Sequence, residues 1–182
     1  MLLVPYAVSV FARCFLYCFH SMRGTCILVI TGFQCTAISL AFIIIASFLP
    51  VGEWNTADLN RAVRYGDELY ASIISASHGR QQIFLMPSDL SRLVEYQGHH
   101  IEINYQVDQI CGMINLERQE SLEHDFMATP FRHGLTTAFL DSNFVLLTVG
   151  ELTVALVYDN VHETFHVIDS HARNSMGVSS GP

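Results

Sequence analysis

The residues best suited to chemistry lie near the two ends of the chain. Asp169 and His171 close an apolar run that begins at Phe165. Residues two apart on a strand point to the same face, so a carboxylate and an imidazole would lie side by side there. Such a pair suits a base and its orienting partner. Cys35 stands far upstream at the head of a long apolar segment. Together the three predict a thiol protease assembled by folding.

Cys35 is the predicted nucleophile, His171 the base and Asp169 the group that fixes the ring tautomer. A helix N-terminus or a neighbouring imidazolium lowers a thiol pKa from about 8.5 to about 3.5–7.5, which creates the reactive thiolate. The structural alternatives are a buried inert thiol at Cys35 and a polar strand exit at Asp169 and His171. The order of the three residues, with a glycine before Gln34-Cys35, favours catalysis.

Composition narrows the class of protein. The 182 residues suffice for one domain with a sizeable core, and 51% hydrophobic against 14% charged residues excludes a disordered chain. A net charge of −8 argues against nucleic acid as a partner. The five cysteines form no Cys-x-x-Cys motif, which favours reduced thiols in an intracellular protein, cytoplasmic or nuclear. His166 and His171 fall on opposite faces of a regular strand, so we predict neither metal nor cofactor.

The N-terminal fifty residues allow two interpretations. Residues 25–50 carry no charge and are long enough to span a membrane, which predicts a single-pass anchor and a membrane location. Alternatively, Cys35–Leu49 is the central helix of a globular core, hydrophobic on all sides and ended by Pro50. The position of Cys35 at the head of this segment favours the helix.

The remaining periodicity predicts an α+β domain in which helices precede an antiparallel meander. Trp54 is expected at a helix junction. Predicted helices are Thr56 to about Ser77–Gly79, Ser88 to about Tyr96, and Phe131–Leu140; predicted strands are Ile83–Met86, His100–Tyr105, Phe144–Val149, Leu152–Tyr158 and Thr164–Ile168.

Two motifs carry a resemblance. Gly-x-Gln-Cys-x-Ala-x-Ser-Leu starts at Gly32, and Asp-Ser-His-x-Arg-Asn starts at Asp169. In this order they resemble the ubiquitin-specific cysteine protease domain of herpesvirus large tegument proteins and related animal and mobile-element domains, from about Thr31 to Pro182. The resemblance implies a papain-like fold with a central apolar helix packed on an antiparallel sheet. It also implies cleavage after the C-terminal glycine of ubiquitin or a ubiquitin-like protein, through Cys35, His171 and Asp169.

The resemblance also divides the chain. Residues 1–30 form an atypical apolar segment (a mispredicted exon, a signal peptide or an anchor), and residues 31–182 form a peptidase domain that we expect to be truncated at its C-terminus. The family takes an oxyanion-stabilising Gln from upstream of the nucleophile, whereas residues 1–33 contain none, and Gln34 belongs to the Gln-Cys motif. A catalytically impaired ubiquitin-binding relic is therefore an alternative.

Overall fold

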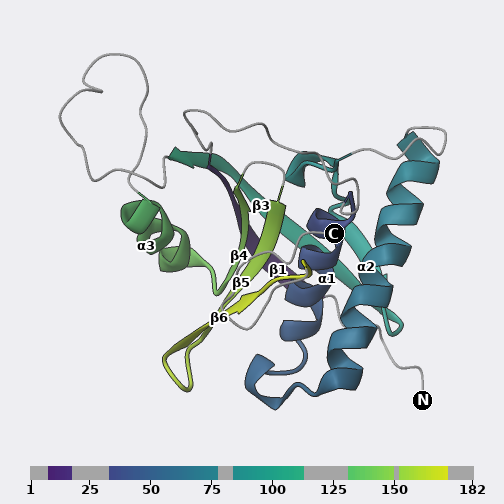
Figure 1. Ribbon diagram of the computed structural model, residues 1–182, viewed down its shortest axis with the longest axis horizontal. Helices are drawn as coiled ribbons and strands as arrows, with labels where there is room; N and C mark the ends of the chain where they lie inside the picture. The colour runs from purple at the N-terminus through teal and green to yellow at the C-terminus, as the bar shows by residue number, and fades with distance from the viewer. Residues whose placement is uncertain (1–7, 18–32, 78–83, 113–130, 150–151, 172–182) are drawn as a thin grey trace.

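The computed structural model describes residues 8–17, 33–77, 84–112, 131–149 and 152–171 (Figure 1). Three helices and six strands make up this part of the chain. The helices are α1 (Cys35–Ala46), α2 (Thr56–Ser77) and α3 (Phe131–Asp141), and two short 3-10 turns span Val51–Glu53 and Pro87–Asp89. The strands are β1 (Val8–Tyr17), β2 (Leu93–Tyr96), β3 (His99–Gly112), β4 (Phe144–Val149), β5 (Leu152–Asp159) and β6 (Thr164–Ile168).

The strands form one sheet in the order β2-β3-β1-β4-β5-β6. β2 and β3 are antiparallel, as are β4, β5 and β6, while β1 runs parallel to both β3 and β4 and joins the two antiparallel parts. The predicted α+β class, with a central apolar helix on the sheet, is confirmed. The arrangement is that of a papain-like fold, and β1 adds a parallel strand to its antiparallel pairs.

The helices cover both faces of the sheet. Neighbouring residues of a strand point to opposite faces, and on β4 Leu146 packs in the core that contains α1 and α2, whereas Val145 packs with Ala138 of α3. On β5, Ala155 and Leu156 divide in the same way. The domain therefore has three layers, with α1 and α2 on one face and α3 on the other.

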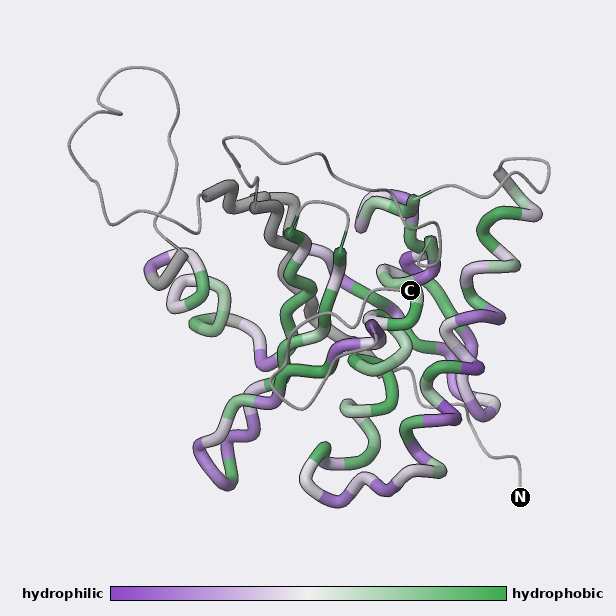
Figure 2. The backbone as a smooth tube through the Cα atoms, viewed as in Figure 1, coloured by the Kyte–Doolittle hydropathy of each residue, from purple (hydrophilic) through white to green (hydrophobic). Residues whose placement is uncertain are grey.

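Helix α1 is the centre of the larger core. All its residues from Cys35 to Ile45 are buried, and it packs against α2 on one side and β5 on the other. Figure 2 shows the helix as apolar along its whole length, unlike α2, which alternates. This confirms the predicted central helix. None of the helices in the described ranges has the length and hydropathy needed to cross a membrane.

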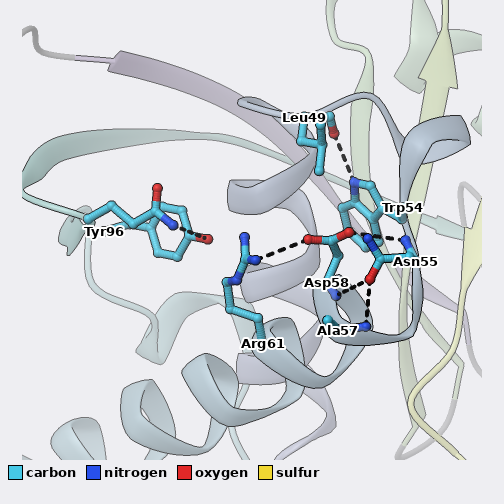
Figure 3. Close-up of polar contacts among 8 residues, drawn as sticks. Leu49, Trp54, Asn55, Ala57, Asp58, Arg61 and Tyr96 are labelled. Atoms are coloured by element: carbon cyan, nitrogen blue, oxygen red, sulfur yellow. Dashed lines mark hydrogen bonds and ion pairs between the residues drawn. The ribbon is translucent and has the colours of Figure 1, made fainter.

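A polar junction connects the end of α1 to the start of α2 (Figure 3). Trp54 Nε1 donates to the carbonyl of Leu49 at 2.9 Å, which confirms its expected place between the helices. The Asn55 side chain accepts from the amide of Ala57 at 2.7 Å, and Asp58 accepts from the amide of Asn55 at 3.0 Å. These reciprocal bonds satisfy amides that every helix N-terminus leaves without an intrahelical partner, so α2 begins where predicted.

The segment before β3 was predicted wrongly. Residues 84–86 are not a strand, and the helix expected from Ser88 is a single 3-10 turn that Asp89 closes by accepting from the amide of Met86 at 2.8 Å. β2 follows and turns into β3 through Gln97 and Gly98, whose φ angles are 52° and 77°. A two-residue hairpin with positive φ at both positions favours glycine, and this was the signal missed.

The N-terminal segment contributes to the sheet. β1 brings ten residues from before the predicted domain boundary into its centre. The two ends of the predicted peptidase domain, residues 31 and 182, stay predictions. Residues 18–32, which include part of the uncharged run, lie outside the described residues.

Gly66 allows α1 and α2 to approach closely. A Cβ at this position would lie 2.5 Å from the Ile38 Cα atom, where no flexible side chain can yield. Gly66→Ala is therefore expected to lower the free energy of unfolding by about 1–3 kcal/mol or more, because the added Cβ overpacks the contact between the helices. Urea denaturation checks this. Gly52→Ala, where the added Cβ meets nothing within 4 Å, is the control and should change stability by less than about 0.5 kcal/mol. Equal stability of the two variants would contradict the close approach.

Candidate active site

Cys35 is the first residue of α1. Its side chain is 3% exposed, and Gln34 occupies the N-cap position without a side-chain capping bond. The first intrahelical hydrogen bond runs from the amide of Ile38 to the carbonyl of Gln34 at 2.9 Å. The amides of the first turn therefore point past the thiol. The positive end of the helix dipole favours a negative charge at this position.

Asp169 and His171 meet immediately after β6. The carboxylate Oδ1 of Asp169 accepts from the backbone amide of His171 at 2.9 Å and from ring Nδ1 at 2.5 Å. β6 ends at Ile168, so the pair is not displayed on one strand face as predicted. A turn closed by the carboxylate brings the two side chains together instead. One oxygen thus fixes both the backbone of His171 and the orientation of its ring.

The register of β5 and β6 carries this pair to α1. Ala155 is opposite Ile168, and continuing that register places residue 170 beside Thr153. Thr153 in turn contacts the first turns of α1 through Thr36 and Ser39. The start of β5 is therefore the place where the head of α1 and the end of β6 converge. In Figure 1 the β6 arrow runs toward α1.

Cys35 and His171 shift each other's pKa. Burial raises the pKa of the Cys35 thiol, but hydrogen bonding to His171 and to the backbone of Thr153 outweighs it, and the pKa lies below its ordinary value. Interaction with Cys35 is the main cause that raises the pKa of His171, burial opposes it, and Asp169 adds to the rise. Both shifts favour a thiolate beside an imidazolium.

Nε2 is the ring atom of His171 that remains for the thiol. Nδ1 is bound to Asp169, so the interaction with Cys35 falls to Nε2, which is buried. A base in this position is within reach of the thiol proton, as general acid–base catalysis requires. The three residues singled out in the sequence thus lie together, and their catalytic role stays a prediction.

Elsewhere in the part of the chain that the structure describes, the polar groups do not form a comparable site. His162 and Asp159 form a similar pair at 2.7 Å, but it lies in the exposed β5–β6 connection with no nucleophile assigned to it. The hollows between α2 and β2 are lined by residues such as Leu69, Ile73 and Tyr65, and their linings include neither a cysteine nor a histidine. Within the described residues, no three His, Cys, Asp or Glu side chains gather as metal ligands.

Sequence reasoning missed the residues that support Cys35. Thr36, Ser39, Thr148 and Thr153 are all buried between α1 and the β4–β5 hairpin. The signal was present, because Thr148 and Thr153 interrupt two apolar strands at positions that a tight hairpin places opposite each other. Buried hydroxyls at facing positions indicate a polar contact with whatever covers that face.

No curated protein matched the chain. Residues 25–181, which include the thiol, the imidazole and the carboxylate described above, match the family described as "Herpesvirus tegument protein, N-terminal conserved region". The match covers most of the sequence and both motifs on which the resemblance rests. The chain therefore belongs to the family of the N-terminal conserved region of herpesvirus tegument proteins.

Proposed function

We propose that this chain is a cysteine peptidase that hydrolyses the bond after the C-terminal glycine of ubiquitin or a ubiquitin-like protein. The observation that carries the proposal is the meeting of three groups: the Asp169 carboxylate contacts Nδ1 of His171 at 2.5 Å, and the Cys35 thiol at the first position of α1 interacts with the same ring. The lowered pKa of Cys35 and the raised pKa of His171 support the proposal. A thiolate paired with an imidazolium is the resting state that a cysteine nucleophile needs.

The reaction follows from the roles of these three groups. The Cys35 sulfur attacks the carbonyl carbon and forms a thioester, while the C–N bond breaks and the proton held by His171 passes to the leaving amine. His171 then takes a proton from water as its oxygen attacks the thioester carbon; the C–S bond breaks, the Cys35 thiolate returns, and the new carboxylate is released. Asp169 holds the ring in the orientation that both steps require.

The oxyanion has one evident source of stabilisation. Backbone amides at the head of α1 point past Cys35, where the negative charge would develop. The Gln that the family resemblance would add has no counterpart in residues 1–33. Loss of one such donor typically costs about 10²–10³ in kcat, so we expect a slow enzyme.

The substrate class rests on the family and on the order of the motifs. The net charge of −8 suits a partner with a basic face. We also propose that the protein acts inside the cell. The alternative, a ubiquitin-binding relic without turnover, is favoured by the missing Gln. Measurable hydrolysis of a ubiquitin amide by the unmodified chain would exclude the relic.

Covalent capture tests the nucleophile. A ubiquitin probe with a C-terminal electrophile should label the chain. Cys35→Ala should reduce labelling and hydrolysis by at least about 10³-fold, because the covalent bond forms on the Cys35 sulfur. Cys111→Ala, which replaces a cysteine on β3, is the matched control and should be labelled normally. Labelling that persists in Cys35→Ala would sink the proposal.

The pH dependence should report the ion pair. Because the Cys35 pKa is lowered, alkylation of this thiol should begin at a lower pH than for an ordinary cysteine. Because the His171 pKa is raised, hydrolysis should persist until the pH rises through that value and then fall. His171→Ala removes the main cause that lowers the Cys35 pKa, so the alkylation profile should move to higher pH. His166→Ala, which removes an imidazole from β6, should leave the alkylation profile unchanged. Equal alkylation profiles for the two variants would contradict an ion pair between Cys35 and His171.

Asp169→Asn tests the orienting carboxylate. The amide carries no charge to raise the His171 pKa, so the alkaline limb of the kcat/KM profile should move to lower pH and kcat should fall. Asp159→Asn alters the similar but exposed pair with His162 and serves as the matched control. A profile unchanged in Asp169→Asn would show that the carboxylate does not act on the base.

A further inference from the structure

Three buried threonine hydroxyls connect α1 to the β4–β5 hairpin. Thr148 Oγ1 lies 3.0 Å from Thr153 Oγ1, which lies 3.0 Å from Thr36 Oγ1. Thr36 Oγ1 is also 2.7 Å from the carbonyl oxygen of Leu85. None of the three threonines is more than 5% exposed. The residues therefore form a hydroxyl chain that water does not reach.

Counting protons fixes the direction of this chain. A carbonyl oxygen only accepts, so Thr36 must use its single hydroxyl proton on Leu85. Thr36 Oγ1 then accepts from Thr153, and Thr153 Oγ1 accepts from Thr148. Each hydroxyl donates once, and Thr153 is the central link. Its loss would leave a donor on Thr148 and an acceptor on Thr36 unmatched in the core, which is costly.

The backbone of Thr153 is also directed at α1. On β5 the amide of Tyr158 donates to the carbonyl of Asn143, on the β4 side. Backbone groups of successive residues in a strand point to opposite neighbours, and Thr153 lies an odd number of residues from Tyr158, so its backbone groups face the β6 side. β6 ends at Ile168, opposite Ala155, and does not reach Thr153 as a strand. The Thr153 carbonyl accepts instead from Ser39 Oγ of α1 at 3.0 Å.

We propose that Thr153 is a positioning residue, which fixes the first turn of α1 where β6 has ended and so holds the Cys35 thiol within reach of His171. The inference rests on the proposed function, since it assigns Thr153 a role in the same site. Thr153 contacts α1 twice, through its hydroxyl and through its carbonyl. A hydrogen bond from the Thr153 backbone also lowers the pKa of Cys35.

The experiment compares Thr153→Val with Thr153→Ser. Valine keeps the branched shape and removes the hydroxyl, whereas serine keeps the hydroxyl. The rate of Cys35 alkylation by iodoacetamide is measured against pH, with the Cys35 peptide followed by mass spectrometry. We expect Thr153→Val to move the profile upward by about one pH unit and to lower kcat with little change in KM. Thr153→Ser should restore most of both. Thr164→Val, an exposed threonine at the start of β6, should change neither.

An unmoved alkylation profile in a folded Thr153→Val variant would overturn the inference. So would a profile that Thr153→Ser shifts equally, because the hydroxyl would then not be the cause. If Thr153→Val does not fold, Thr36→Val cuts the same link from the helix side and is judged by the same criteria. Alkylation needs no protein substrate. A shifted profile without ubiquitin hydrolysis would therefore refute the proposed function alone, and hydrolysis with an unmoved profile would refute this inference alone.

Discussion

The site depends on the complete burial of one helix. Helix α1 exposes almost nothing from Cys35 to Ile45, so it must have α2 on one side and the sheet on the other. A helix buried in this way can move by only a fraction of the width of a side chain, because protein cores are packed as densely as organic crystals. A thiol at the first position of such a helix is therefore held in an equally well-defined place. A cysteine on a surface loop would have to obtain its position from other contacts.

Burial alone does not set the rotation and depth of α1. A helix that is apolar all round has no face that must point to the core. Polar groups supply the missing specification, since Thr36 and Ser39 find partners in only one orientation of the helix. Apolar packing therefore gives the stability of the contact, and hydroxyl pairing gives its geometry.

The sequence predicted the elements better than the contacts between them. The uncharged run after Cys35 predicted the central helix, and the short apolar runs around Val145 and Ala155 predicted the meander. Short elements were predicted wrongly, as at Ser88, because a single turn and a four-residue strand contain too few residues to show a hydrophobic periodicity.

The site was predicted as a set of residues, not as a geometry. The spacing of Asp169 and His171 indicated their partnership, but the turn that joins them depends on where β6 ends. Their meeting with Cys35 depends on the register of β5 and β6, a non-local property that no short motif encodes. Thr153 escaped notice for the same reason, since its role appears only when the end of one strand and the head of a helix are placed together.

The central position of β1 has a consequence for how the chain reaches its native state. Its two partners, β3 and β4, begin about 90 and 135 residues later in the sequence. During synthesis this strand leaves the ribosome before β3 and β4, so it cannot form either of these pairings until β3 has been made, and its second edge stays open until β4 follows. Contacts of such long range make folding slow, and an apolar strand that waits unpaired is exposed to aggregation in the interval. Chaperone protection during translation would therefore matter more for this topology than for one that closes its sheet from adjacent hairpins.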